Sequence, residues 1–337
     1  MNTDKILHYQ LTSIGGLEDV VADELKELLG SRVQALRIER GEVGRLYFRT
    51  EASPPRLQQL QCPTAIEAIA LQAHDVTVGQ PGLQRILQVI GKLPVQTMRR
   101  LACACDDDIV PERLQLRVTS SGAHRFSAED VERGALPILQ RQGFELGVPK
   151  PESGPESRPG RALRMAVRVQ GKRVLVAVHL GPRRPMGDPQ TEGWAGPAEH
   201  SVRRLLDLDA DLVVGGIPAA PGRPLGFALH QAGAENILRT ASTEAELPLR
   251  TGALPVLLMV PGAASDVAAV QLQEAVRAVT PGGIVAVLTR QPELFVPLLR
   301  DLGLPLEVMA SLPYYVRRRR CALFLLERLE LLGIELA

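Results

Sequence analysis

The sequence has few aromatic residues and no long apolar run. Phe, Trp and Tyr together make up 3% of the 337 residues. A nucleic-acid contact of this chain would therefore depend on arginine, backbone and shape more than on stacking rings. No apolar run approaches the roughly 18 residues of a membrane span, and the opening MNTDKILHYQLTS has no signal-peptide pattern. These absences predict a cytoplasmic protein without membrane contact.

Cysteine is also scarce, and the charges nearly balance. The four cysteines form no Cys-x-x-Cys pair, and of these Cys103 and Cys105 alone are close in sequence. Because no His or Cys pair supplies the other half of a tetrahedral set, we expect no metal site. Three adjacent acids, Asp106 to Asp108, cannot all face one ion, which favours a solvated turn. A net charge of +1 neither requires nor excludes a nucleic-acid partner, since a basic patch can lie within a neutral total.

The hydrophobic content is high enough for more than one folded core. With 337 residues, 45% of them hydrophobic, the chain is expected to form two or three domains. The first part has an α+β pattern. It begins with a strand, a Gly-Gly turn and an amphipathic helix from Leu17 to Leu29, and two strands follow around Gly41 and Gly44. A second helix, GLQRILQVIGKL, comes after an apolar run at residues 66–71.

A further α+β unit begins at Arg113. The strand RLQLRVT leads through a polar loop to a helix that opens on Ser127, whose side chain can cap the helix. Pro137 lies inside this helix and is expected to bend it. After the loop VPKPESGPESRPGR, the alternating segments ALRMAVRV and RVLVAVHL predict a hairpin around QGK. His179, at the end of the hairpin, is more typical of a packed histidine than of a catalytic base.

From about Trp194 the pattern changes to buried strands that alternate with helices. The predicted strands are DLVVGGI, PVLLMV, IVAVLT, LEVMASL and CALFLLER. Such alternation indicates a mostly parallel, doubly wound sheet. The fold class is therefore α/β, with an α+β half followed by this sheet.

A cluster of hydrogen-bond donors lies beside the helix that opens on Ser127. Its members are Arg117, Thr119, Ser120, Ser121, Gly122, His124 and Arg125. The helix end adds partial positive charge, so the cluster is suited to phosphate groups. The alternative is a solvated loop in which His124 and Phe126 pack locally.

Two other basic pairs are candidates for contact with a nucleic acid. Arg183 and Arg184 follow the predicted hairpin, and Arg317 and Arg318 belong to YYVRRRRC between the last two strands. Each pair either binds phosphate or is part of a solvated connection.

Three segments resemble the THUMP-domain RNA methyltransferases, and the likeness covers nearly the whole chain. TSIGGLEDVVADELKEL resembles their ferredoxin-like module, LRVTSSGAHRFSAEDVERG the THUMP signature, and VTPGGIVAVLT the fifth strand of a Rossmann-type methyltransferase. The resemblance implies a ferredoxin-like domain with a linker at 1–98, a THUMP domain at 99–185 and a Rossmann-like methyltransferase-type domain at 194–337. It also implies RNA as a partner, since similar THUMP modules hold the acceptor end of tRNA.

The C-terminal part departs from the family pattern. Such enzymes carry two strand-and-helix units before an acidic segment, here Glu244 to Leu249, whereas this chain has one, DLVVGGIPAAPGRPLGFALHQAG. We therefore expect a truncated sheet with fewer than the usual seven strands. Whichever unit is present, GGIPAAPG lacks the acidic residues and the Gly-x-Gly loop that hold S-adenosylmethionine in the family.

The loop after PVLLMV also lacks side chains that the family uses. Guanine-N2 methyltransferases carry an Asn-Pro-Pro-Tyr-like loop there, in which Asn orients the exocyclic amine and the aromatic ring stacks on the flipped base. Alignment on the strand puts Val260 at the Asn position and Ala263 at the aromatic position, while Pro261 remains. Because Val cannot accept a hydrogen bond and Ala cannot stack, we expect no catalytic residue and no cofactor.

Three hypotheses follow. The first is an RNA-binding protein, with tRNA as its ligand, whose methyltransferase site has decayed. The second is an active S-adenosylmethionine-dependent tRNA or rRNA guanine-N2 methyltransferase with a diverged or partner-completed site. The third is a scaffold subunit that docks a partner methyltransferase. The first is favoured, because a deleted unit is harder to replace within one chain than a substituted residue.

Overall fold

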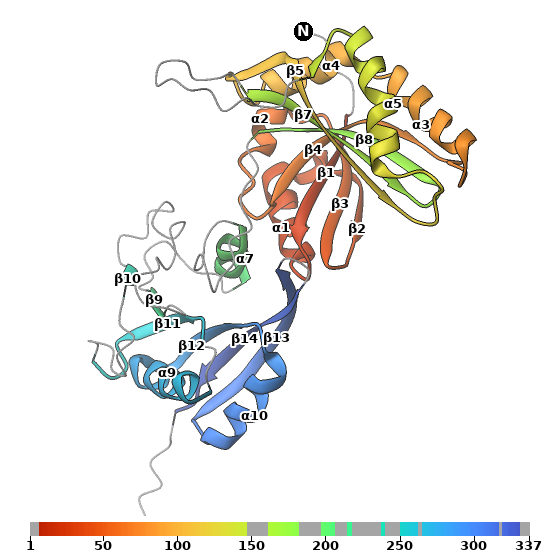
Figure 1. Cartoon of the computed structure of the whole chain (residues 1–337). Coiled ribbons are helices and arrows are strands. Elements are labelled where there is room, and N and C mark those ends of the chain that lie inside the picture. Colours follow the sequence, from red (N-terminus) through yellow and green to blue (C-terminus); the bar gives the residue numbers. More distant parts are fainter. Residues whose placement is uncertain are drawn as a thin grey trace, which may run out of the picture.

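The computed structural model describes residues 7–146, 161–181, 197–205, 214–217, 237–239, 250–261, 265–316 and 319–330. The described strands form two sheets (Figure 1). The first has eight strands in the order β2-β3-β1-β4-β8-β7-β5-β6, and the second has six in the order β10-β9-β11-β12-β14-β13. The predicted α/β fold class, an α+β half followed by a Rossmann-type sheet, is confirmed.

The eight-stranded sheet joins the two predicted α+β units. Its strands are β1 (Leu7–Ile14), β2 (Gln34–Glu39), β3 (Val43–Thr50), β4 (Ala65–Ala73), β5 (Ile109–Ser121), β6 (Glu145–Leu146), β7 (Arg161–Gln170) and β8 (Arg173–His179). β7 and β8 form the predicted antiparallel hairpin. β4 of the first unit pairs with β8 of the second, so the sheet is continuous.

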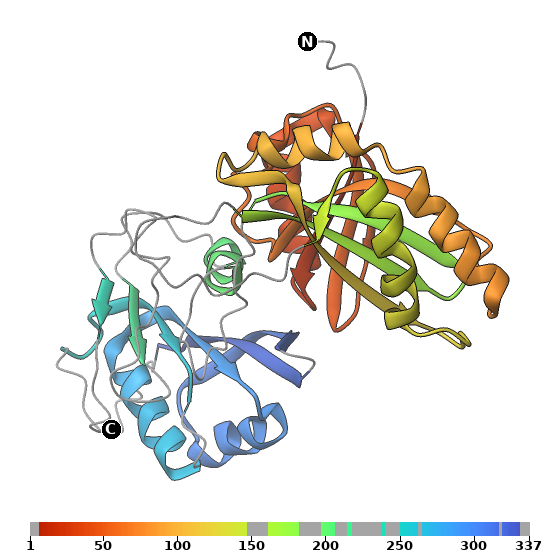
Figure 2. The same cartoon turned by 45° about the horizontal axis from the view of Figure 1, so that its top comes forward.

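Helices cover one face of this sheet (Figures 1 and 2). They are α1 (Glu18–Leu29), the 3-10 helix η1 (Gly30–Arg32), α2 (Pro54–Leu57), α3 (Gln80–Gly91), α4 (Val95–Cys103) and α5 (Ala128–Arg141). Apolar residues of α1 pack on Tyr9 and Leu11, and those of α3 and α5 pack on Val167 and Val176. Strand pairing puts these four strand residues on one face. The opposite face carries no helix among the described residues, and we call it the open face.

Ser127 caps α5, as the sequence predicts. Its Oγ accepts a hydrogen bond from the Asp130 backbone N–H at 3.1 Å, and Asp130 Oδ2 accepts one from the Ser127 N–H at 2.8 Å. These reciprocal bonds satisfy two donors at the helix start. They fix the direction in which the chain leaves β5 and enters α5.

The six-stranded sheet is mostly parallel. Its strands are β9 (Val214–Ile217), β10 (Ile237–Arg239), β11 (Leu254–Met259), β12 (Val279–Thr289), β13 (Leu306–Val316) and β14 (Arg319–Arg328). The helices α7 (Pro197–Leu205), α9 (Ser265–Ala278) and α10 (Pro292–Leu302) accompany it. β10, β9, β11 and β12 are parallel, whereas β14 and β13 are antiparallel to their neighbours. No helix within the described ranges is long and apolar enough to cross a membrane.

Two sequence predictions for this sheet have different outcomes. The predicted turn TPGG is an irregularity inside β12, where the pairing with β11 passes from Leu254 opposite Val279 to Val256 opposite Ile284. The predicted loss of a strand-and-helix unit stays a prediction, because residues 218–236 and 240–249 lie outside those that the structure describes.

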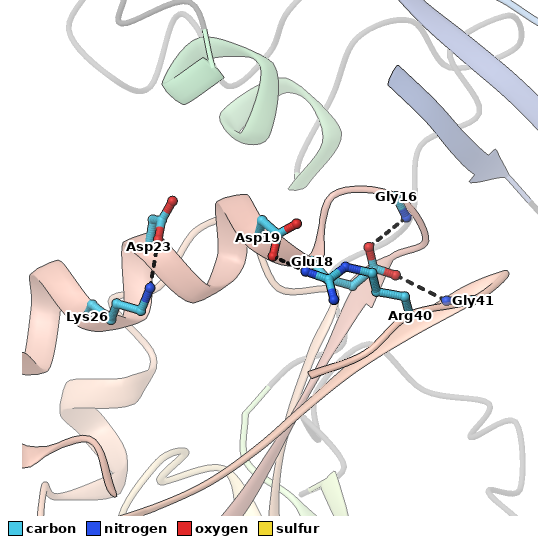
Figure 3. A network of polar contacts seen from close by, with 7 residues as sticks. All are labelled: Gly16, Glu18, Asp19, Asp23, Lys26, Arg40 and Gly41. Atoms are coloured by element: carbon cyan, nitrogen blue, oxygen red, sulfur yellow. Dashed lines mark hydrogen bonds and ion pairs between the residues drawn. The ribbon is translucent and has the colours of Figure 1, made fainter. Parts of the chain in front are cut away.

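The Gly-Gly turn after β1 contacts the second sheet. The buried carboxylate of Glu18 links this turn to the one between β2 and β3, because it accepts hydrogen bonds from the N–H groups of Gly16 at 2.9 Å and Gly41 at 3.4 Å (Figure 3). The carbonyl oxygen of the preceding Gly15 accepts a hydrogen bond from the N–H of Tyr315 in β13 at 3.0 Å. Leu17 belongs to an apolar cluster with residues of β11, β12 and β14. The two sheets therefore meet at this turn.

Candidate nucleic-acid interface

The open face carries more arginines than carboxylates. The alternation along each strand and the pairing between strands place on it Arg37, Arg45, Arg49, Arg113, Arg117, Arg164, Arg168 and Arg173, with Glu39, Glu67 and Glu145 as carboxylates. Five of these arginines have no ion pair with a carboxylate among the described residues, namely Arg45, Arg49, Arg113, Arg117 and Arg164. Such an excess of positive charge attracts phosphate groups.

Contacts between distant strands indicate that the open face is concave. Arg173 Nη1 on β8 lies 4.0 Å from Glu39 Oε1 on β2, although β3, β1 and β4 separate these strands. Arg168 on β7 reaches across β8 and β4 and donates a hydrogen bond to Gln10 Oε1 on β1 at 3.4 Å. A concave surface of one charge sign concentrates its potential on a ligand that lies within it.

A buried carboxylate lies at the centre of the open face. Glu67 Oε1 accepts hydrogen bonds from Arg168 Nη2 at 2.5 Å and from His179 Nε2 at 3.0 Å, and the Glu67 side chain has no exposed surface. Burial raises the pKa of Glu67, but hydrogen bonds from His179 and Arg168 together with their charges outweigh it and lower the pKa to about 2. Glu67 is therefore ionised and positions both partners. The interpretation of His179 as a packed histidine agrees with its side-chain exposure of 10%.

A pocket of about 330 Å³ lies next to His179. Its walls are formed by Gln115, Leu116, Arg117, Arg164, Met165 and His179. In the parallel pairing of β5 with β7, Gln115 lies opposite Arg164, and Arg117 lies opposite Ala166. The two arginines are thus diagonal neighbours on adjacent strands.

The structure divides the predicted donor cluster between four places, of which the hollow that holds His124 is described below. Arg117 and Thr119 are exposed on the open face, whereas Ser120 alternates with them and faces the helix side of β5. Arg125 is exposed in the turn before α5, where its backbone N–H donates to the Val78 carbonyl oxygen at 2.8 Å. The cluster is not one site, and the open face contains three of its members, Arg117, Thr119 and Ser121.

His124 lies in a separate hollow near the turn between β7 and β8. Its ring stacks on Phe126 with centroids 4.7 Å apart, which is the local packing that the sequence left open. Both ring nitrogens are buried and have no hydrogen-bond partner among the described residues. This hollow, about 380 Å³ in volume, is also lined by Asp75 and Lys172.

The remaining candidates cannot be placed on either face. Arg183, Arg184, Arg317 and Arg318 lie outside the residues that the structure describes. In the part of the chain that is described, no three His, Cys, Asp or Glu side chains gather as metal ligands would.

Sequence reasoning missed several residues of the open face. Arg164 and Arg168 occupy alternate positions of ALRMAVRV, and this period of two was a signal that both lie on one face of the strand. Glu67 and Gln10 gave no such signal. The contact of Arg168 with Glu67 joins residues 101 positions apart in the chain, and strand order decides it.

Val260, at the end of β11, is a packing residue. Its side chain has no exposed surface, and it lies in an apolar cluster with Leu258 and Ala286. Pro261 is also buried. Ala263 lies outside the described residues. At the position that the alignment gives to the family's Asn, the chain therefore presents no hydrogen-bonding side chain.

The strand order of the second sheet contains the reversal of direction at which open parallel sheets form a ligand crevice. The chain passes from β9 outward to β10 and then continues on the other side of β9 with β11 and β12. In open parallel sheets, ligands bind outside the carboxyl ends of the strands at such a reversal of direction. The described strands place this crevice between the ends of β9 and β11, at Ile217 and Met259.

Solved structures resemble this protein over nearly its whole length. TrmN from Thermus thermophilus has a TM-score of 0.71 at 18% identity, with 96% of this chain and 100% of TrmN covered. SMU.472 complexed with SAH has a TM-score of 0.59 at 11% identity, with 96% and 98% covered. A possible methylase from Clostridium difficile 630 has a TM-score of 0.57 at 10% identity, with 97% and 99% covered. The fold is that of a THUMP-type methyltransferase. No protein-family model and no curated protein matches the sequence.

The expectation of no cofactor is wrong. SMU.472, which shares the fold, is complexed with SAH, the form of S-adenosylmethionine that has lost its methyl group. The physical reason lies in the topology, because in open parallel sheets the position of a ligand crevice depends on strand order, which here reverses between β9 and β11. The side chains of GGIPAAPG were the wrong criterion for deciding whether the cofactor binds.

Proposed function

We propose that this protein binds RNA, with tRNA as its ligand, through the open face of the eight-stranded sheet. The observation that carries the proposal is the set of arginines without carboxylate partners on a concave face. Each arginine that neutralises a phosphate releases counterions, and this release drives binding. The THUMP-type fold supports RNA as the ligand, since the sequence resembles a family whose module holds the acceptor end of tRNA.

Shape and phosphate contacts are the expected means of recognition. Tyr47, on the open face, has Arg37 over its ring at 5.7 Å, and aromatic residues make up 3% of the whole chain. A surface with so few rings is suited to the backbone of a folded RNA and not to a row of stacked bases.

S-adenosylmethionine is the proposed ligand of the second sheet. The crevice between the ends of β9 and β11 would hold it, and the bound molecule supplies an activated methyl group. The chain's own contribution at the described edge is apolar, because Met259, Val260 and Pro261 are buried there. These residues would exclude water from the crevice, but they cannot orient an amine.

Transfer of the methyl group to a guanine amine is proposed to be lost. Val260 cannot accept a hydrogen bond from an exocyclic amine and packs in the apolar cluster instead. The predicted loss of a strand-and-helix unit supports the same conclusion.

The second candidate function is an active RNA methyltransferase. The SAH complex of SMU.472 favours it. In this case the groups that orient the amine that accepts the methyl group would come from another part of the chain or from a partner methyltransferase.

Three measurements on the purified protein distinguish these functions. We expect fluorescence anisotropy with labelled tRNA to show binding that weakens steeply between about 50 and 200 mM salt. Calorimetry is expected to show binding of S-adenosylmethionine. Incubation of tRNA with methyl-labelled S-adenosylmethionine is expected to leave the RNA unlabelled. Absence of tRNA binding would refute the main proposal, and methyl incorporation would establish the second candidate in its place.

A further inference from the structure

We propose that the pocket lined by Arg117, Arg164 and His179 binds a single nucleotide unit of an RNA strand, with its phosphate between the two arginines. This inference depends on the proposed RNA-binding function and identifies one subsite within it. The pocket is lined by residues of β5, β7 and β8 on the open face. Its His179 contacts the buried Glu67.

The charges of the pocket favour an anion. Arg117 is exposed and Arg164 is half-buried, and neither has a carboxylate partner among the described residues. They are diagonal neighbours on adjacent strands, where like charges repel each other. A phosphate placed between them would relieve the repulsion and accept charge-assisted hydrogen bonds from both guanidinium groups.

The other walls suit the rest of a nucleotide. Gln115 offers an amide for a sugar hydroxyl or a base edge, whereas the side chains of Leu116 and Met165 pack on the helix side, so these two residues line the pocket floor between the arginines. His179 forms the remaining wall, and its ring is held in place by the hydrogen bond to Glu67 at 3.0 Å. A ring whose orientation is fixed in advance presents the same surface to each ligand, which lowers the entropy cost of binding.

The size of the pocket selects one nucleotide and not a base pair. Its volume of about 330 Å³ is near the lower end of the range of about 300 to 1,000 Å³ for small-ligand sites. A base within a duplex is paired and stacked, so a pocket of this kind is accessible to an unpaired nucleotide of a loop or a strand end.

Competition experiments with the full-length protein test the proposal. The probe is a fluorescently labelled, single-stranded RNA octamer, and the competitors are adenosine monophosphate, cytidine monophosphate, adenosine and inorganic phosphate. We expect the monophosphates to displace the octamer, inorganic phosphate to do so more weakly, and adenosine to have little effect. Arg164→Ala should weaken binding of the monophosphates by about tenfold to a hundredfold, since charge-assisted hydrogen bonds to phosphate are lost.

Two further variants keep the test decisive. Arg117→Ala, at an exposed position, should weaken monophosphate binding in the same way even if Arg164→Ala fails to fold. Arg85→Ala is the matched control, because Arg85 is exposed on α3 on the helix side of the sheet. It should leave monophosphate binding unchanged.

The outcomes separate this proposal from the proposed function. If wild-type protein binds tRNA but no monophosphate competes, or both pocket variants bind monophosphates like the wild type, the subsite is wrong and RNA binding stands. If monophosphates bind but tRNA does not compete with them, the pocket serves free nucleotides and the RNA subsite is overturned. If wild-type protein binds no RNA of any kind, the proposed function itself fails.

Discussion

Arg168 on β7 donates a hydrogen bond from Nη2 to Glu67 Oε1 on β4 at 2.5 Å, across the intervening strand β8. Beneath this contact lie Ala166 and Ala177, two small buried residues that pair with each other on the open face. The ion pair ties the first α+β unit to the second. It also spans the concave open face, on which the proposed RNA binding depends.

The lowered pKa of Glu67 predicts a loss of stability in acid. Its folded-state pKa of about 2 lies below the ordinary value of a glutamate. The stabilisation is therefore present above about pH 5 and is lost as pH falls toward 2. We expect Glu67→Gln to reduce the free energy of unfolding at pH 7 by about 3 kcal/mol, with a difference from wild type that shrinks as pH falls. Urea unfolding at pH 7, 5, 4 and 3 measures this.

Glu51→Gln is the control for that series, because Glu51 is exposed and follows β3. Its stability should run parallel to that of the wild type at every pH. Identical pH profiles for Glu67→Gln and the wild type would contradict the role given to the buried carboxylate.

Packing of Val260 predicts the cost of restoring the family's residue. Val260→Asn would place an amide in an apolar cluster, which costs about 1 to 3 kcal/mol when no partner is available. Val270→Asn is the matched control, since Val270 is 40% exposed on α9, and its effect should stay within about 0.5 kcal/mol. Thermal unfolding of both variants checks this. A fully stable Val260→Asn that also methylates tRNA would show that the loop can act as an acceptor site.

The elements with strong local signals could be predicted from sequence. The apolar spacing from Leu17 to Leu29 predicted α1, and the alternation on both sides of QGK predicted the β7–β8 hairpin. Ser127 predicted the start of α5. Each of these features depends on residues close together in the chain, and so one sequence contains the whole pattern.

The open face could not be predicted in the same way. The pairing of Glu67 with His179 depends on β4 lying beside β8. The sequence of neither strand indicates which strand it pairs with more than 100 residues away. The cofactor prediction failed for a related reason, because strand order forms the crevice between β9 and β11 whereas the prediction relied on side chains. The domain boundaries and the predicted missing unit stay predictions.

The capping of α5 can be tested with a pair of serines. Ser127→Ala removes the acceptor of the Asp130 N–H and should cost about 1 kcal/mol of stability. Ser53 occupies the corresponding position before α2 but makes no side-chain capping bond, so Ser53→Ala should change stability by less than about 0.5 kcal/mol. Chemical unfolding measures the free energy of unfolding of both variants, and equal losses would show that the cap does not fix the start of α5.

Close packing around Glu18 predicts different effects at two glycines. A Cβ added at Gly44 would overlap the Glu18 side chain, which holds the turn between the two sheets. Gly44→Ala should therefore destabilise the protein by about 1 to 3 kcal/mol. A Cβ at Gly41 would meet no atom closer than 4.0 Å, and Gly41→Ala should be nearly neutral. The urea midpoints of Gly44→Ala and Gly41→Ala measure the two effects. A larger loss of stability in Gly41→Ala would contradict the close packing of Gly44 against Glu18.

Binding of tRNA by a charge-reversed open face tests the account most directly. The variant Arg49→Glu with Arg117→Glu changes two exposed arginines of the open face, and the control Arg85→Glu with Arg133→Glu changes two exposed arginines on helices α3 and α5. The measurement is the anisotropy of labelled tRNA across a range of salt concentrations. We predict that the open-face variant binds at least about tenfold more weakly than the control, with a salt slope smaller by about two. Equal affinities and equal salt slopes for the two variants would contradict the assignment of RNA binding to the open face.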